Sequence, residues 1–154
     1  MKCYINPYLN YGIILWGNTY KNILHKLVIL QKKAIRIITG ANYNDHCSPL
    51  YNICDVLKVN DLYSFNICKL VYDFIKSELP SSLNNIYIYN RDFHVYQTRN
   101  RGDVCMPLVN SALARNSFLC KGPEIWTSLP VHIKYANTTN LFKRKLRQHY
   151  LVNY

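Results

Sequence analysis

Residues 21–39 limit what this chain can fold into more than any other segment, because their apolar side chains repeat with the period of an α-helix. On a wheel of about 100° per residue, apolar residues fill one half, and polar or basic residues fill most of the other. Gly40 follows at the position where helices often end in a glycine cap. The pattern predicts an amphipathic helix packed through Leu27, Leu30 and Ala34.

Further helical patterns recur along the chain, each bounded by a Pro, a Gly or a capping residue. Residues 86–108 instead hold β-forming side chains around the turn signal Asn100-Arg101-Gly102-Asp103, which predicts a small β-hairpin. We therefore expect a mainly α fold, with a helical bundle over residues 1–79 and the hairpin and terminal helices over residues 80–154. The expected helices lie at about residues 7–16, from 48 or 52 to 57, 61–77, 122–129 and 140–152.

Tryptophans and cysteines supply further candidates for the core. Trp16 and Trp126 both lie among aliphatic residues in short predicted helices, so we expect them in the core with Leu27 and Leu30. The six cysteines are scattered, with no two closer than seven positions, and are expected as buried thiols. His46-Cys47 with Cys54 comes nearest to a zinc-binding pattern but lacks a fourth ligand, so no metal site is predicted.

Charge is distributed unevenly along the chain, which carries nineteen Lys and Arg against eight acids and a net charge of +11. Residues 1–44 carry six bases and no acid, residues 45–79 carry three bases and five acids, and residues 80–154 carry ten bases and three acids. Clustering of this kind matters more than overall basicity, because a basic patch acts on a polyanion only where its charges gather.

The polar half of the 21–39 helix contains no acid, although helices usually mix both signs because Glu–Lys pairs four residues apart are favourable. Phosphate groups would relieve the resulting repulsion and give salt-dependent binding without sequence preference. The alternative is a face that is only solvated. Tyr96, with two arginines of the predicted hairpin, is a candidate for stacking on a base. The candidate nucleic-acid-binding residues are Lys21, Lys26, Lys32, Lys33, Arg36, Arg99, Arg101, Lys143, Arg144, Lys145 and Arg147.

Several function classes lack their sequence signals. The longest apolar run, residues 11–16, is far shorter than the ~20 residues that span a bilayer, and no secretion signal opens the chain. Polymerases and nucleases that use Mg²⁺ need carboxylates brought together, whereas this chain has no Asp-Asp pair. It also lacks the phosphate-binding loop and the common hydrolase motifs. We therefore expect no catalysis, metal, cofactor or membrane partner for this chain alone.

Several short motifs follow one another in an ordered series. They are Tyr11-Gly12 with Trp16-Gly17, the run LQKKAIRIITG of residues 30–40, Leu79-Pro80, Tyr96 with Thr98-Arg99, the run GPEIWTSLP of residues 122–130, and a closing Phe142-Lys143 helix. Their order and spacing over residues 5–152 resemble the segment after the catalytic palm in reverse transcriptases of non-LTR retrotransposons (LINE-type, jockey-like). Thr127 stands where members of that family usually have Asn.

The resemblance implies a thumb and C-terminal portion of an RNA-directed DNA polymerase without its active site. The fingers and the palm, with its paired Asp and Mg²⁺, would lie before Met1. It also implies binding to an RNA and/or DNA template–primer duplex, contact with the polymerase palm, and an intracellular location in the nucleus and cytoplasm as part of a retrotransposon ribonucleoprotein. The alternative is a decayed or host-adopted fragment that binds proteins and has no nucleic-acid role.

Overall fold

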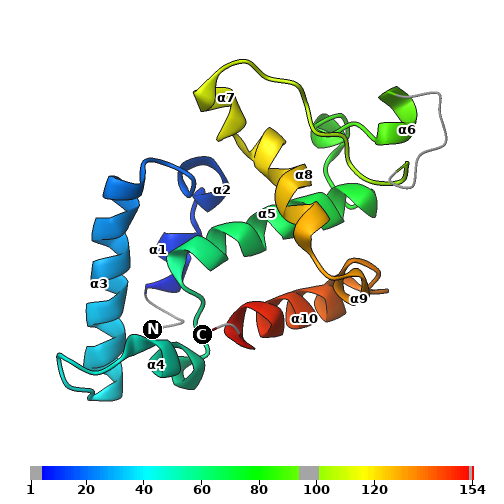
Figure 1. Cartoon of the computed structure of the whole chain (residues 1–154). Helices are drawn as coiled ribbons and strands as arrows, with labels where there is room; N and C mark the ends of the chain where they lie inside the picture. The colour runs from blue at the N-terminus through cyan, green and yellow to red at the C-terminus, as the bar shows by residue number, and fades with distance from the viewer. Residues whose placement is uncertain (1–4, 94–100, 153) are drawn as a thin grey trace. The chain divides into compact units, whose positions relative to one another are not determined.

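The computed structural model describes residues 5–93, 101–152 and 154, which form ten α-helices and one 3-10 turn (Figure 1). The predicted mainly α class is therefore confirmed. Two compact units divide the chain: unit 1 is Met1–Asn66 with Lys143–Tyr154, and unit 2 is Ile67–Phe142. In chain order the elements are α1 (Asn6–Asn10), α2 (Ile13–Trp16), α3 (Lys21–Thr39), α4 (Cys47–Cys54), α5 (Val59–Ile75), η1 (Ser81–Leu83), α6 (Asn90–Phe93), α7 (Ala112–Arg115), α8 (Phe118–Ser128), α9 (Val131–Lys134) and α10 (Thr139–Val152).

Unit 1 begins with α1 and α2, two short helices in place of the single helix predicted over residues 7–16. Pro7 lies in the first turn of α1, where its missing N–H removes no helical hydrogen bond. Gly12 has a φ of 60°, a left-handed conformation that favours glycine, and it separates the two helices. α2 ends at Trp16, and the C-cap residue Gly17 donates its N–H to the Ile13 carbonyl at 2.7 Å.

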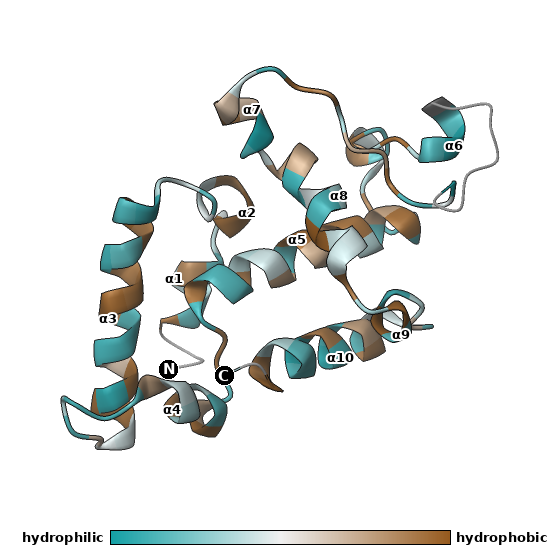
Figure 2. Ribbon diagram, in the orientation of Figure 1, coloured by the Kyte–Doolittle hydropathy of each residue, from teal (hydrophilic) through white to brown (hydrophobic). Residues whose placement is uncertain are grey.

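The long helix α3 has the bounds that the sequence predicts. Gly40 adopts a φ of 66°, and the Ala41 N–H donates to the Arg36 carbonyl at 3.0 Å, so the helix ends in a Schellman-type cap. Apolar and polar residues alternate in colour along the whole of α3 (Figure 2). Local signals in the sequence therefore predict both this helix and the residue at which it ends.

The core of unit 1 forms where α3 packs against α4. Ile35 of α3 is fully buried in a cluster with Cys47 and Tyr51 of α4. Leu50 and Tyr154 are partly buried and pack against the same cluster. Tyr154 also meets the Tyr51 ring edge-on, with the ring centroids 5.7 Å apart. This cluster fixes the face of α3 that turns inward.

Gln31 lies one turn before Ile35 and is buried with only 3% of its surface exposed. Its Nε2 donates to the Leu57 carbonyl at 2.8 Å. Its Oε1 accepts from the Val59 N–H and from the Tyr51 hydroxyl, each at 3.2 Å. A buried amide whose groups are paired in this way holds α3, α4 and the start of α5 in one arrangement, because any shift would leave polar groups unpaired.

The prediction that Leu30 belongs to the core is wrong, because Leu30 does not lie on the inward face of α3. Leu30 is 61% exposed, Leu27 and Ala34 are half-buried, and Ile23 and Ile37 are 60% and 80% exposed. The wheel identifies an apolar half, but α4 and α5 cover only the edge of it that contains Gln31 and Ile35. Ile23, Leu30 and Ile37, on the opposite edge of the apolar half, form an exposed stripe.

The predicted core tryptophans have different surroundings. Trp16 is only half-buried, so it is not a core residue as predicted. Its Nε1 donates to the Tyr11 carbonyl at 2.7 Å, a contact within the α1–α2 segment. Trp126 is 3% exposed in unit 2, with its ring 6.0 Å from that of Phe142. Phe142 in turn stacks on Tyr72 at 4.1 Å. An aromatic cluster therefore forms much of the core of unit 2.

Helices α8 and α10 lie close to the predicted segments but begin earlier. α8 starts at Phe118 rather than near Gly122, and α10 starts at Thr139. Thr138 caps the start of α10, because its hydroxyl accepts from the Leu141 N–H at 3.3 Å.

The β-hairpin predicted over residues 86–108 is not borne out. Among the residues that the structure describes, no strand forms, and a single isolated antiparallel bridge joins Tyr89 to Val104. Asn90–Phe93 continues instead as the short helix α6. Residues 94–100 of the predicted hairpin lie outside the described residues. Strand propensity there yields to packing, since Tyr89 and Tyr87 both turn toward the ring of Phe74.

Candidate nucleic-acid interface

Unit 1 brings together most of the predicted basic residues, although they come from both ends of the chain. It carries eleven Lys and Arg against three acids, a net charge of +8, whereas unit 2 carries eight against five, a net charge of +3. Arg101 lies exposed in unit 2. Arg99 and Tyr96 lie outside the described residues. The remaining nine predicted residues all belong to unit 1.

Four lysines of α3 are exposed along the helix: Lys21, Lys26, Lys32 and Lys33. The helix contains no acid, so no side chain within it neutralises them. Lys21 even occupies the first residue, where a positive charge opposes the helix dipole. The arrangement is therefore electrostatically unfavourable for the isolated helix, and an external anion would relieve it.

Arg36 has a more structural position than the four lysines. Its Nε and Nη2 donate to the Asp45 carbonyl at 3.3 and 3.0 Å, which ties α3 to the loop before α4. The guanidinium also lies 5.7 Å from the centroid of the Tyr43 ring. Arg36 keeps its charge, but part of its hydrogen-bonding capacity is already used.

The basic residues of α10 differ among themselves. Arg147 forms an ion pair with Asp55, its Nε lying 2.8 Å from the carboxylate Oδ1, and its Nη2 also donates to the Asp55 carbonyl. This pair holds α10 to the turn after α4, so Arg147 is better explained as a structural contact than as a free phosphate ligand. Arg144 is exposed, and Lys143 and Lys145 are half-buried.

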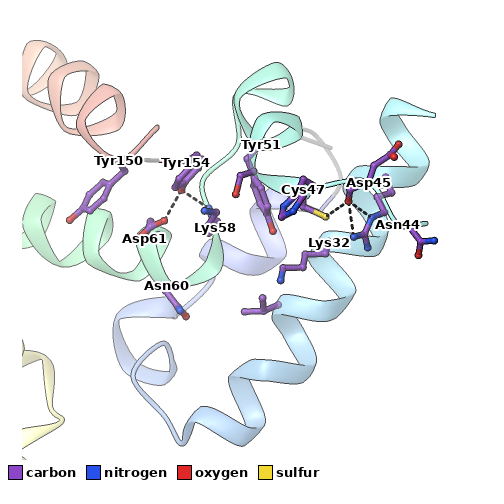
Figure 3. A pocket seen from close by; sticks show the side chains of 14 residues that line it. Lys32, Asn44, Asp45, Cys47, Tyr51, Lys58, Asn60, Asp61, Tyr150 and Tyr154 are labelled. Carbon is purple, nitrogen blue, oxygen red and sulfur yellow. Dashed lines mark hydrogen bonds between the residues drawn. The ribbon is translucent and has the colours of Figure 1, made fainter. Parts of the chain in front are cut away.

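A hollow of about 740 Å³ lies beside the basic side of α3, within unit 1 (Figure 3). Lys32 and Arg36 line it from α3, and Lys58 lines it from just before α5. In Figure 3 the side chain of Lys32 reaches from α3 into the same hollow as Tyr51 and Lys58. Its lining residues are Val28, Lys32, Arg36, Asn44, Asp45, His46, Cys47, Ser48, Tyr51, Lys58, Asn60, Asp61, Tyr150 and Tyr154.

Lys58 is the residue that sequence reasoning missed. It lies in the net-acidic middle of the sequence, so its charge there looks neutralised by neighbours along the chain. The fold instead places it in a hollow with Lys32 and Arg36. No local pattern could have found this, because the hydrogen bonds from Gln31 of α3 to Leu57 and Val59 place the intervening residue beside α3.

Hydrogen bonds hold the aromatic wall of the hollow in place. The Tyr154 hydroxyl donates to Asp61 Oδ2 at 2.7 Å and accepts from the Lys58 N–H at 2.9 Å. Burial, followed by the hydrogen bond to the Asp61 carboxylate, keeps the pKa of Tyr154 well above its usual value, although the bond from Lys58 opposes the shift. Burial and nearby Cys47 also raise the pKa of Tyr51 to about 12. Both phenols are therefore neutral hydrogen-bonding groups at physiological pH.

The chemistry available at this surface is binding of anions. Three cations and an imidazole face the hollow together with two carboxylates, Asp45 and Asp61. Each carboxylate already accepts a hydrogen bond at 2.7 Å, from the Asn42 N–H and from Tyr154 respectively. Within the described part of the chain, no group of three or more His, Cys, Asp or Glu is placed to hold a metal ion. Among the same residues, no helix combines the length and apolar character needed to cross a membrane.

Comparisons of the chain with protein-family models, with curated proteins and with solved structures find no match. The resemblance to the retrotransposon reverse transcriptases therefore rests on the ordered motifs in the sequence.

Proposed function

We propose that this chain binds the sugar–phosphate backbone of a nucleic-acid duplex through unit 1, as a non-catalytic thumb-like portion of a reverse transcriptase. The observation that supports this proposal most strongly is the exposed, acid-free lysine surface of α3. Lys21, Lys26, Lys32 and Lys33 form no ion pair with another described residue, so their charges are available to phosphates. Contacts of this kind fix affinity and its salt dependence but carry no base specificity.

The ordered motifs give this proposal its biological setting. A template–primer duplex and the polymerase palm are the partners that the resemblance implies, and a ribonucleoprotein is the assembly in which they would meet. The catalytic carboxylates and Mg²⁺ belong to the palm in this proposal. Residues 1–154 supply positive charge and a helical scaffold.

Fluorescence anisotropy with labelled duplexes tests this function. Lys21, Lys26 and Lys33 are exposed and do not line the hollow, so replacing all three with Gln keeps the fold and the helix propensity. The variant should bind two duplexes of unrelated sequence more weakly and by the same factor. Unchanged affinity in the folded variant, or a loss restricted to one sequence, would contradict backbone binding by α3.

A second candidate function, a protein-interaction module, is favoured by the exposed apolar stripe of α3. Ile23, Leu30 and Ile37 recur every seven residues at 60%, 61% and 80% exposure, and half-buried Leu27 and Ala34 lie between them. This spacing is the heptad pattern by which helices pair. Lys26 and Lys33 border the stripe, so the complementary partner is an amphipathic helix of another protein with acidic residues beside its apolar seam. An antiparallel second copy would place Lys26 against Lys33 and repel.

Two designed helical peptides test this second function. Both carry Leu at the seam positions, and one has Glu and the other Lys at the flanking positions. The acidic peptide should bind, and the variant with both Leu30→Ser and Ile37→Ser should lose it. Equal binding of the two peptides, or no binding of either, would remove the interaction function.

A further inference from the structure

Lys58 is held in an unusual environment for a cation. Its Nζ lies 3.9 Å from the centroid of the Tyr154 ring and 5.7 Å from that of Tyr51. The side chain is half-buried, and no carboxylate among the described residues forms an ion pair with it. Aromatic rings attract a desolvated cation but leave its charge uncompensated. The lining of the hollow therefore contains a lysine that contacts aromatic rings and has no ion-pair partner among the described residues.

Two further cations face the same space from α3. Lys32 and Arg36 lie one helical turn apart and both line the hollow with Lys58. The two carboxylates of the lining are already hydrogen-bonded, Asp61 to Tyr154 and Asp45 to the backbone of the loop before α4. Three cations against two hydrogen-bonded carboxylates leave the lining with a net positive charge, which favours a phosphate group as the occupant.

The size and walls of the hollow indicate more than a phosphate alone. Its volume of about 740 Å³ lies in the range of small-ligand sites, whereas one turn of duplex is about 34 Å long. Tyr150 of α10 and Tyr154, which follows α10, also line the hollow. Proteins that bind single strands combine a positive groove with aromatic rings on which unpaired bases stack.

We propose that the hollow binds one unpaired nucleotide at the end of the duplex, with its phosphate at Lys32, Arg36 and Lys58 and its base against Tyr150. This inference rests on the proposed function, because the duplex bound along α3 delivers the unpaired end. It assigns different tasks to the two surfaces: Lys21, Lys26 and Lys33 hold paired backbone, and the hollow, which Lys32 lines, holds the strand that leaves the duplex.

Two duplexes of identical paired sequence test the proposal, one blunt and one with a single-stranded extension containing 2-aminopurine. The wild-type chain should bind the extended duplex about fivefold more tightly or better, from one stacked base, and should quench its fluorescence. Lys58→Gln and Tyr150→Leu should each abolish that preference and leave affinity for the blunt duplex unchanged. Lys58→Arg and Tyr150→Phe keep the charge and the ring, so they should retain it.

The outcomes separate this inference from the proposed function. Equal affinity of the wild type for both duplexes, or an equal loss on both in Lys58→Gln, overturns the inference and leaves backbone binding by α3 intact. No binding of the blunt duplex, together with Lys58-dependent quenching of a free single strand, overturns the duplex function and supports the hollow. Displacement of the extended duplex by inorganic phosphate as efficiently as by a nucleoside monophosphate would show that no base is recognised, which also overturns the inference.

Discussion

The ionisation of Tyr51 is linked to the stability of unit 1. Its ring is buried between α3 and α4, and its hydroxyl donates to Gln31 Oε1 at 3.2 Å. Burial raises its pKa to about 12, and electrostatic interactions with Cys47 and Asp61 act in the same direction while Arg36 opposes them. The proton is therefore held more tightly in the folded chain than in the unfolded one.

This shift predicts a loss of stability at alkaline pH. Between about pH 10 and 12 the unfolded chain releases the Tyr51 proton and the folded chain keeps it, so rising pH favours unfolding. Below pH 10 both states are protonated and the contribution is constant. Urea unfolding at pH 9, 10 and 11 should show a falling free energy of unfolding, and Tyr51→Phe should make the decline shallower. The same decline in both proteins would show that Tyr51 is not the linked group.

Two apolar residues of α3 should respond very differently to truncation, although they lie close together on the same helix. Ile35 is fully buried and Leu30 is 61% exposed. Ile35→Ala should therefore cost about 2–5 kcal/mol of unfolding free energy, and Leu30→Ala less than about 1 kcal/mol. Chemical denaturation of both variants measures the difference. A cost for Leu30→Ala comparable with that of Ile35→Ala would mean that the stripe is covered in solution.

At the level of elements, α8 carries a close backbone approach that constrains unit 2. A Cβ atom on Gly122 would lie 2.4 Å from the Tyr87 Oη and 2.9 Å from its Cζ. Tyr87 is 5% exposed and its hydroxyl donates to the Phe118 carbonyl at 3.1 Å, so the ring has little room to move. The glycine is required by contact rather than by backbone conformation.

Gly122→Ala should therefore destabilise the chain by about 1–3 kcal/mol, as overpacking of a filled site does. Tyr87→Phe removes the atom that clashes most, so the double variant should be less destabilised than the sum of the two single variants. Thermal unfolding of the four proteins measures this coupling. Additive losses would show that the helix shifts away from Tyr87 instead of pressing on it.

The elements also show which features a sequence can predict. The bounds of α3 follow from its period and from Gly40, which are local signals. The face of α3 that turns inward does not follow from them, because nine of its ten apolar residues share one half of the helical wheel. Only the packing of α4 and the hydrogen bonds of Gln31 select between them. The β-forming residues near Tyr89 give one bridge rather than strands, since contacts with Phe74 outweigh propensity.

For the whole molecule, the uneven charge seen in the sequence becomes a difference between two units. The basic ends of the chain meet in unit 1, which the sequence could suggest but not establish. Lys58 joins them despite its net-acidic sequence neighbourhood, and Arg147 is occupied by Asp55 despite its basic one. The distribution of charge along the chain therefore indicates which segments are basic, and the fold determines which of their side chains remain available to bind anions.

The salt dependence of duplex binding tests the central claim most directly. Log K against log salt should be measured for the wild type, for Lys21, Lys26 and Lys33 replaced by Gln, and for Lys69, Lys76 and Arg115 of unit 2 replaced by Gln. Each lost phosphate contact removes about 0.7–0.9 from the slope, so the α3 variant should be flatter by about 2–3 units and the unit 2 variant should match the wild type. Circular dichroism confirms that both variants fold. Equal slopes for the two variants would contradict the claim that α3 carries the nucleic-acid interface.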